Sequence, residues 1–507
     1  MSAKRDNRTV YNMVTYLVSQ GVHMLIAVVL PRMLLATYGA EINGVMSTVN
    51  SFVSYFHYLE AGLGLTLIHA LFKPLADRDT EATNRILSFS KDQYHKISYI
   101  YFFLVTSLAF LFPLFNKSDA LSTLELVSLV FVIGVSGALD FYTMSRYRVL
   151  LTADRKEYVL SSVVIMSQGI RFLLVWALLH FRLSIVVIKL IPIMTLLFRT
   201  AALRLYIKKH YPNVSYSESY PPNVVETSKR WDAMVMQISI STSVALPMIL
   251  VSQTQGYVEA NVYSIYNLVA GTVISIVSAL SSGIAPLFGR ILATGGDIKK
   301  YYGIYEFVVA CILTVFFSVC AVMMLPFVKL YTNVVADVNY IRPSYAVLVS
   351  LWAALHTFRM PLTAMINAAA LYKENRINNI LNLVLQIGGG ILMAIFFGVN
   401  GVIIAVIIAA VQRNVGMSAV ISKKVMNGNW LNSMKRQIAM TAIIVGSAIV
   451  GFMIVPVEGI TVISWVLYAC AATCIIAIVS LCVLCALDWR AAKNAFDFFL
   501  EKFKIKR

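Results

Sequence analysis

Long apolar runs recur from one end of the chain to the other, separated by short polar segments. Each run holds roughly 20 residues or more, enough for a helix to cross about 30 Å of hydrocarbon. We identify about fourteen runs, with approximate centres near residues 23, 58, 105, 134, 168, 194, 242, 270, 313, 355, 387, 408, 447 and 474. The pattern therefore predicts an all-α polytopic membrane protein. Its first run, near 11–35, is too long for a signal peptide and is predicted to be a retained span.

The two halves of the chain repeat the same register of residues at an offset of about 217 positions. The matched pairs include Gln20 with Gln237, Ser47 with Ser264, Asn50 with Asn267, and the Lys-Glu dipeptides at 156–157 and 373–374. Six spans per half is an even number, so both repeats would share one orientation in the membrane. The repeat predicts two six-helix bundles, followed by two extra helices, in the arrangement of transporters whose halves rock about a central site.

The repeat and the polar segments together divide the chain into five predicted regions. The N-terminal bundle covers 1–210, a proline-containing cytoplasmic linker covers 211–230, the C-terminal bundle covers 231–436, two extra transmembrane helices fall within 437–488, and a basic cytoplasmic tail covers 489–507. No segment is long enough to fold as a separate soluble domain.

Basic residues are distributed unevenly between the two sides of the predicted membrane. The chain has 42 Lys and Arg against 24 Asp and Glu, a formal net charge of +18. Only Lys117, Arg182 and Lys329 fall in outer loops, and most of the others fall in inner segments. This bias predicts a multi-pass protein of the cell membrane with both termini in the cytoplasm. The contiguous basic clusters with aromatics that bind nucleic acid are missing, so we expect no nucleic-acid partner.

Five basic residues lie inside the predicted spans: Arg32, Arg171, Lys189, Arg342 and Arg359. A cation in hydrocarbon costs about 2.5 kcal/mol or more, so such residues face protein or water unless they snorkel to the headgroups. Arg171 and Arg359 lie about 20 Å from their helix starts, near mid-membrane, and Arg32 lies in the outer part of the first span. Lys189 and Arg342 lie within about two turns of outer ends, where snorkelling is expected. A cationic interior favours an anionic cargo.

Polar residues follow one face of the second and eighth spans. Asn50 and His57 recur with serines at three- and four-residue steps in the second span, and Asn267 lies in the matching stripe of the eighth. Small and hydroxyl residues alone would favour close helix packing. The amides and the imidazole need partners or water, which favours a cavity lining in at least one conformation. Asn50, His57 and Asn267 are therefore candidate substrate-binding residues.

Glu60 lies near the middle of the second span, one turn after His57. A buried carboxylate must pair with a cation, become neutral or face water. One interpretation is a site that couples transport to H⁺ or Na⁺, with His57 contributing. The alternative is that Glu60 is the structural partner of a nearby arginine. On the tenth span His356 and Arg359 are likewise one turn apart.

Signatures of enzymes and of cofactor sites are missing from the sequence. The outer loops are too short for a catalytic domain, and no nucleotide-binding loop or metal-ligand cluster appears. Cys482 and Cys485 have the spacing of a redox or metal pair, but in an apolar span a small buried hydrophobe is favoured. We expect no enzyme activity, no catalytic residues, no metal and no cofactor, with energy supplied by an ion gradient or by the cargo's own gradient.

Short motifs occur at 59–65 (LEAGLGL) and 71–76 (LFKPLA), at Pro31-Arg32 with 38–44 (YGAEING), and at 370–375 (ALYKEN). With the membrane organisation, which covers essentially the whole chain, they resemble the polysaccharide flippases of the multidrug/oligosaccharidyl-lipid/polysaccharide (MOP) exporter superfamily. These flip lipid-linked repeat units. The resemblance implies two bundles around a cationic cavity and an oligosaccharide on undecaprenyl pyrophosphate as cargo.

The implied cargo agrees with the charges in the spans. A pyrophosphate needs charge-assisted donors, and Arg offers a bidentate fork, so Arg32, Arg171 and Arg359 would engage it. The implied partners are the lipid-linked oligosaccharide, the lipid bilayer and other membrane proteins of polysaccharide assembly. The two extra helices are compatible with the family's fourteen-helix members.

The resulting hypothesis is an alternating-access flippase that moves its cargo from the cytoplasmic to the outer leaflet, for surface polysaccharide biosynthesis. One alternative is a multidrug or organic-cation antiporter on the same fold, which predicts that acidic residues dominate the cavity. A second alternative is a polytopic glycan polymerase or ligase, which would need a large outer loop with catalytic groups.

Overall fold

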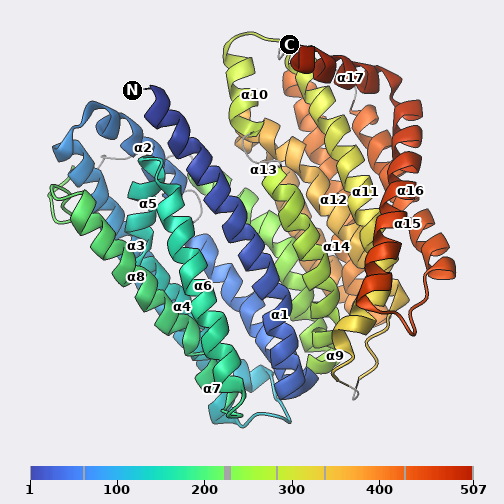
Figure 1. The fold of residues 1–507 in the computed structure, drawn as a ribbon, viewed down its shortest axis with the longest axis horizontal. Coiled ribbons are helices and arrows are strands. Elements are labelled where there is room, and N and C mark those ends of the chain that lie inside the picture. Colours follow the sequence, from blue (N-terminus) through green and yellow to red (C-terminus); the bar gives the residue numbers. More distant parts are fainter. Residues whose placement is uncertain are drawn as a thin grey trace. The chain divides into compact units, whose positions relative to one another are not determined.

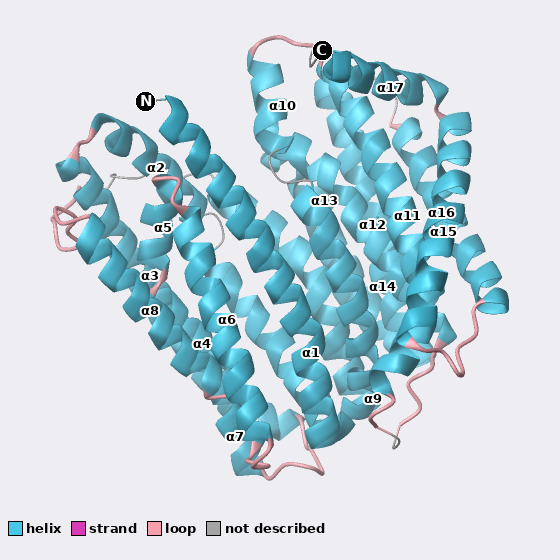
Figure 2. Cartoon of the chain, viewed as in Figure 1, coloured by secondary structure: helices cyan, strands magenta, loops and turns pink. Residues whose placement is uncertain are grey.

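The computed structural model describes residues 2–60, 63–221, 230–280, 284–335, 338–426 and 430–504. Across these ranges Figure 2 shows helices joined by short loops, and none of the described residues is in a strand. The chain divides into two compact units, Met1–Ile238 and Ser239–Arg507, which we call the N-terminal and C-terminal units.

The N-terminal unit is a helical bundle (Figure 1) in which α3 packs on α4 and α1 packs on α6. Its elements are α1 (Ser2–Phe56), the 3₁₀ turn η1 (His57–Glu60), α2 (Leu63–Asp77), α3 (Thr80–Phe115), α4 (Thr123–Thr143), α5 (Ser145–Ala153), α6 (Glu157–Leu179), α7 (Ile185–Ile188) and α8 (Ile191–His210). Polar caps set two of the starts. The Asp79 side chain accepts from the Ala82 N–H at α3, and Ser122 forms a capping box with Glu125 at α4.

The C-terminal unit is also helical, and α11 lies at its centre, packed on α12, α15 and α16. The elements of this part of the chain are α9 (Arg230–Leu280), α10 (Ile284–Ala293), α11 (Ile298–Thr332), α12 (Pro343–Ala368), α13 (Tyr372–Val384), the π-helical turn η2 (Leu385–Gly389), α14 (Gly390–Ile421), the π-helical turn η3 (Ser422–Met426), α15 (Leu431–Ile454), α16 (Val462–Leu487) and α17 (Trp489–Lys504). The α12 and α14 helices pack closely on each other.

Ten helical segments of the described chain are long and apolar enough to span a membrane. Three of them, Tyr11–Glu60, Val235–Ser278 and Tyr372–Met426, contain 50, 44 and 55 residues. At about 1.5 Å per residue each is more than twice as long as the hydrocarbon is thick, so each supplies two spans. The ten segments confirm the predicted polytopic all-α fold. α12, with 26 residues, is long enough to cross a membrane but is not among the ten, and counting it would give the predicted fourteen spans.

A glycine in a left-handed backbone conformation divides each of the three long segments. Gly39 has φ 78° and ψ −179°, and Gly256 has φ 82° and ψ 175°. Gly398 divides the third segment with φ 57°. The conformation of the first two is open essentially to glycine alone, because any Cβ would clash with the backbone. These glycines are where the chain turns from one span into the next.

The same left-handed positions recur in both units. Gly39, Arg78, Arg155 and Arg182 have positive φ in the N-terminal unit, and Gly256, Gly295, Ala370 and Gly398 have positive φ in the C-terminal unit. Each residue of the first set matches one of the second at an offset of about 216 residues. The repeat predicted from the sequence is therefore also present in the backbone conformation of the two units.

A glutamate follows each of the first two glycines by two or three residues and accepts a hydrogen bond from another segment of its own unit. Glu41 accepts a hydrogen bond from the Ser118 hydroxyl at 2.6 Å. Glu259 accepts from the Tyr345 hydroxyl at 2.6 Å and pairs with Arg342 at 3.5 Å. Arg342, which the sequence predicts to snorkel, thus has a carboxylate partner.

The second span differs from the continuous helix that its apolar run predicts. The α1 helix ends at Phe56, η1 covers His57–Glu60, and α2 begins at Leu63. A 3₁₀ turn has about three residues per turn, so His57 and Glu60 still project from similar directions. An interrupted helix is tolerated at membrane depth only where protein or water satisfies the freed backbone groups. The break therefore indicates a polar environment at this level.

The described part of the predicted linker, up to residue 221, lies along the first half of α3. The Asn84 side chain donates to the Asn213 carbonyl at 3.1 Å and accepts from the Ser215 N–H at 2.9 Å. The Tyr220 hydroxyl donates to Asp92 at 2.8 Å. These bonds explain why the first half of α3 is polar. The rest of the predicted linker, up to residue 229, lies outside the described residues.

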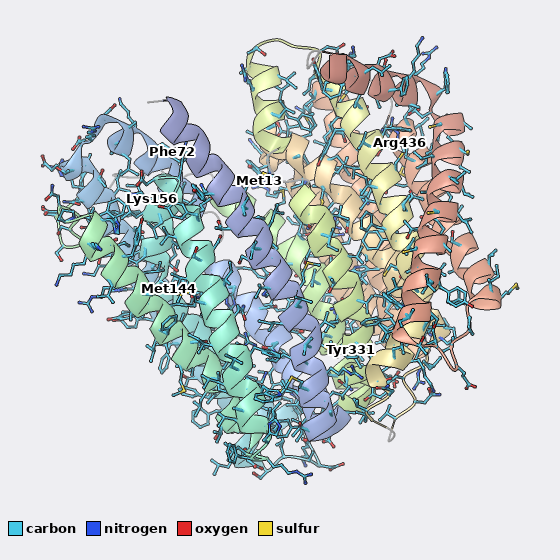
Figure 3. The ribbon with its side chains drawn as sticks, in the orientation of Figure 1. Met13, Phe72, Met144, Lys156, Tyr331 and Arg436 are labelled. Carbon is cyan, nitrogen blue, oxygen red and sulfur yellow. The ribbon has the colours of Figure 1, made fainter. Side chains whose placement is uncertain are left out.

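The stretch predicted as a basic tail contains helix α17, which runs across the end of its unit in Figure 1. It packs on α11 and α16, with Ala491 and Ala495 buried. Asp488 accepts from the Ala491 N–H at 3.1 Å and also from Arg436, which is labelled in Figure 3. Arg436 pairs with Glu306 of α11 at 2.7 Å. One buried ion network therefore joins the two extra spans to the bundle.

Candidate functional site

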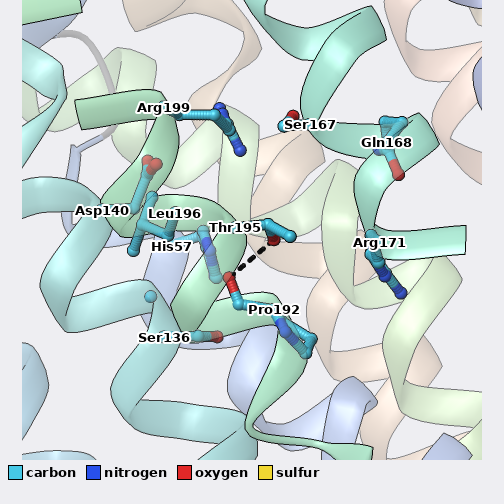
Figure 4. A pocket seen from close by; sticks show the side chains of 11 residues that line it. His57, Ser136, Asp140, Ser167, Gln168, Arg171, Pro192, Thr195, Leu196 and Arg199 are labelled. Carbon is cyan, nitrogen blue, oxygen red and sulfur yellow. Dashed lines mark hydrogen bonds between the residues drawn. The ribbon is translucent and has the colours of Figure 1, made fainter. Parts of the chain in front are cut away.

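A polar cavity lies inside the N-terminal unit, among η1, α4, α6 and the start of α8. Its volume is about 190 Å³. It is lined, as Figure 4 shows, by His57, Ser136, Gly137, Asp140, Ser167, Gln168, Arg171, Pro192, Thr195, Leu196 and Arg199. A cavity of this size holds a few water molecules or one polar group of a ligand. It therefore suits the charged head of a larger molecule.

A network of charged groups reaches one side of the cavity through Asp140. The Asp140 carboxylate of α4 lies 4.0 Å from the Arg148 guanidinium of α5. Arg148 also pairs with Glu60 at 3.3 Å, and the Tyr94 hydroxyl of α3 donates to Glu60 at 2.7 Å. The bend between α4 and α5 brings Arg148 within reach of both carboxylates. Both acidic groups near the cavity are thus already engaged by a cation.

Arg171 and Arg199 bring positive charge to the cavity. The Nε atom of each is buried and has no hydrogen-bond partner, and neither forms an ion pair with a described carboxylate. Arg199 is attracted by Asp140 at longer range. Arg171 lies close enough to Lys189 for the two charges to repel. Because a guanidinium stays protonated in proteins, the cavity remains cationic.

The cavity has two chemically different sides. Figure 4 shows Arg171 and Gln168 of α6 on one side, and Asp140 and His57 on the other. His57 Nδ1 lies 3.2 Å from the Tyr101 hydroxyl. The buried Nε of Arg171 on α6 therefore lies on the side of the cavity that has no carboxylate.

Two residues predicted from the sequence, His57 and Arg171, line this cavity. Glu60 does not line it, but it meets the network through Arg148. Arg148 is thus a nearby arginine of the kind required by the alternative interpretation, in which Glu60 forms a structural ion pair. The ion-coupling role of Glu60 and His57 stays a prediction.

Arg32 and Asn50 are not among the residues that line the cavity. Arg32 is partly buried after Pro31 on α1, and Asn50 is exposed on the same helix beyond Gly39. Asn267 is partly buried on α9. The substrate-binding roles of these three residues stay predictions.

Arg359 lies inside the C-terminal unit beside a second arginine. Its Nη2 atom is 3.4 Å from Nε2 of His356, one turn earlier on α12. Arg413 of α14 is 0% exposed and donates to the Ser243 hydroxyl at 3.2 Å. No ion pair of the described residues includes Arg359 or Arg413. The role of Arg359 in cargo binding stays a prediction.

Sequence reasoning missed Asp140, Arg148, Arg199 and Arg413. Arg199 and Arg413 lie five residues past the run centres near 194 and 408, and α8 and α14 continue beyond them to His210 and Ile421. The signal that would have found these two and Asp140 is an ionisable residue within about two turns of a span centre, which is rare unless it has a function or a partner. Arg148 lies 14 residues past the run centre near 134 and carries no such signal.

Among the described residues, no group of three or more His, Cys, Asp or Glu is placed to hold a metal ion. The six cysteines are free, and Cys482 and Cys485 lie on α16, exposed and partly buried respectively.

The fold resembles those of solved transporters. A eukaryotic MATE transporter, AtDTX14, matches with a TM-score of 0.57 and 14% identity over 87% of this chain and 99% of that one. The lipid II flippase MurJ, in an inward closed conformation, matches with a TM-score of 0.55 and 11% identity over 94% and 99%. A MOP superfamily transporter from Pyrococcus furiosus, reported to have a binding pocket of reverse polarity, matches with a TM-score of 0.58 and 13% identity over 85% and 96%.

No protein-family model and no curated protein sequence matches the chain. The structural likeness extends over most of the chain, and at these identities it concerns the fold. The protein is therefore a polytopic membrane protein with the fold of MOP superfamily transporters, and these structural neighbours are transporters and flippases.

Proposed function

We propose that the protein is an alternating-access flippase for oligosaccharides linked to undecaprenyl pyrophosphate, acting in the cytoplasmic membrane in surface polysaccharide biosynthesis. The observation that carries the proposal is the N-terminal cavity, in which Arg171 and Arg199 have buried Nε groups without partners. A diphosphate offers several acceptor oxygens, and arginine binds phosphate oxygens in a bidentate manner. The two arginines would thus hold the charged head of the cargo.

The charge balance of the cavity favours an anionic cargo over an organic cation. Asp140 is the acidic residue of the lining. Arg148 lies 4.0 Å from it, and Arg199 is attracted to it. A third cation would bind only weakly to a carboxylate that two cations already share, because both arginines would repel it. An organic-cation antiporter on the same fold is the alternative, and it requires cation binding at Asp140.

Further roles in this proposal follow from the sequence. Glu60 and His57 would couple transport to H⁺ or Na⁺, and Arg32, Asn50 and Asn267 would contact the cargo as it crosses. Both termini would face the cytoplasm, as the distribution of Lys and Arg predicts. Other membrane proteins of polysaccharide assembly would supply and receive the cargo.

Glycan export in cells whose only flippase is this protein tests the proposal. Arg171→Glu and Arg199→Glu are each expected to reduce export about tenfold or more, because each reverses a charge that would bind the diphosphate. Arg204→Glu is the matched control, since Arg204 lies further along α8 and is exposed. It should export like the wild type at equal membrane abundance. Normal export by well-expressed Arg171→Glu contradicts the proposal.

A further inference from the structure

Two arginines in the C-terminal unit lie on helices that contain no acidic residue. Arg359 is on α12 and Arg413 is on α14, and neither helix contains Asp or Glu. These helices pack closely on each other. In the same unit, buried Arg436 is paired with both Glu306 and Asp488. The contrast indicates that a partner for Arg359 and Arg413 is not supplied by these helices.

Arg413 is more deeply buried than Arg359 and has more unpaired nitrogen atoms. It is 0% exposed, and only its Nη1 atom has a hydrogen bond, to the Ser243 hydroxyl at 3.2 Å. Its Nε and Nη2 atoms are buried without partners. A buried lysine could lose its proton, but a guanidinium stays charged. An enclosed charge of this kind is destabilising unless a counter-charge lies against it.

The imidazole of His356, beside Arg359, also presents an unpaired donor. Nη2 of Arg359 donates to Nε2 of His356, which places the imidazole proton on Nδ1. That Nδ1 and the Nε of Arg359 are buried without partners. The charges of Arg359 and Arg413 act on each other and on His356. A cluster with unsatisfied donors and mutual repulsion selects an acceptor that carries negative charge.

We propose that the C-terminal unit binds one small inorganic anion, of the size and charge of chloride, between Arg359 and Arg413, with Ser243 and His356 beside it. Size follows from burial, because Arg413 is 0% and His356 2% exposed, and of the three only Arg359 is partly exposed. A diphosphate attached to a sugar and a lipid does not fit a position that is open only at Arg359. The site uses none of the residues of the N-terminal cavity and does not depend on the proposed cargo.

The surrounding backbone is held in place by side-chain amides. The Asn414 amide donates to the Leu355 carbonyl of α12 at 2.9 Å. The Asn382 amide of α13 donates to the Ala409 carbonyl of α14 at 2.6 Å. These bonds fix α14 against its neighbours on both sides of Arg413. The anion therefore joins a preformed site, and its binding stabilises the packing of α12 on α14.

Thermal unfolding of the full-length protein in detergent tests the site, with chloride as the probe. Sodium gluconate is replaced stepwise by sodium chloride at constant ionic strength. The midpoint temperature of the wild type is expected to rise saturably, by about 3 °C. Arg413→Leu should lose this response. It should also unfold no earlier than the wild type in gluconate, because an apolar residue replaces an uncompensated charge.

Two further variants separate this site from the N-terminal cavity and from a folding defect. Arg171→Leu changes the N-terminal cavity alone and should keep the chloride response. Ser243→Ala removes a neutral partner and should raise the chloride concentration at half-response about fivefold. This second variant preserves the test if Arg413→Leu does not fold.

Three results would each overturn the proposal. The first is that the wild type has the same midpoint temperature in chloride and in gluconate. The second is that the chloride response persists in Arg413→Leu or disappears in Arg171→Leu. The third is that inorganic diphosphate, tested in parallel, gives an Arg413-dependent response that chloride does not give, which would assign the site to the cargo's phosphates. Loss of glycan export in the Arg171 variants bears only on the proposed function.

Discussion

The N-terminal and C-terminal units share a backbone plan but differ in where their unpaired interior arginines lie. In the N-terminal unit Arg171 and Arg199 line an open polar cavity, next to the network in which Arg148 pairs with Glu60 and Asp140. In the C-terminal unit Arg359 and Arg413 have no carboxylate partner among the described residues. The repeat therefore fixes where helices turn, whereas individual side chains decide what each unit binds.

The two units illustrate two ways in which a membrane protein can stabilise a cationic side chain in its interior. An unpaired cation that lines an open cavity can be hydrated until an anionic ligand arrives. A fully buried cation without a carboxylate, such as Arg413, is destabilising unless an anion stays bound beside it. We therefore assign transient contact with the cargo to the N-terminal arginines and a resident anion to the C-terminal ones.

The largest expected effect comes from breaking the compensated network of the C-terminal unit. Glu306→Leu leaves Arg436, whose side chain is 5% exposed, with Asp488 alone. We expect a loss of about 3–5 kcal/mol in the free energy of unfolding, measured by denaturant titration in detergent. The triple variant Glu306→Leu/Arg436→Met/Asp488→Asn removes the remaining charges and keeps an acceptor for the Ala491 N–H, so it should recover most of this loss. A triple variant as unstable as the single would show that the loss does not come from an incompletely paired Arg436.

The paired glycines test whether the two units share one backbone plan. Gly39→Ala and Gly256→Ala should each cost about 1–3 kcal/mol in the free energy of unfolding, because both need a glycine-only conformation. No atom lies within 4 Å of an added Cβ at either position, so the cost is conformational. Gly21→Ala, in the regular part of α1, is the control and should stabilise by up to about 1 kcal/mol. A cost at only one of the two glycines would contradict the repeat.

The smallest effect is expected where the N-terminal network is partly open to solvent. Glu60→Gln leaves Arg148, whose side chain is 42% exposed, with Asp140 at 4.0 Å. We expect a loss of about 1 kcal/mol in the free energy of unfolding, measured as for Glu306→Leu. Tyr94→Phe, which removes the other donor to Glu60, is the companion variant. A loss as large as that of Glu306→Leu would remove the contrast between the two units.

Hydropathy and residue spacing predicted the spans and the repeat because both are set by local sequence. A run of about 20 apolar residues is visible in the chain, and so is the shared register of Asn50 and Asn267. Depth along a span also located Arg171, which lines the cavity. Such patterns do not show which residues of different spans meet. The pairs of Glu60 with Arg148 and of Glu306 with Arg436 join residues 88 and 130 positions apart.

Two other features were hidden for different physical reasons. The 3₁₀ turn at His57–Glu60 interrupts an apolar run that reads as a continuous helix, because hydropathy does not report backbone hydrogen bonding. Arg413 lies only a few residues past the centre of its span, but the sequence does not show what surrounds it. Its enclosure depends on α9, α12 and α13, and only the folded unit reveals it.

The most direct test of the central claim is translocation of a lipid-linked oligosaccharide in vesicles that contain the purified protein. An undecaprenyl diphosphate-linked oligosaccharide, its monophosphate analogue and a lipophilic organic cation would be compared in the same vesicles, with wild type and Arg171→Glu. We predict that the wild type moves the diphosphate-linked molecule fastest and that Arg171→Glu loses this activity. Transport of the organic cation, abolished by Asp140→Asn and unaffected by Arg171→Glu, would contradict the account.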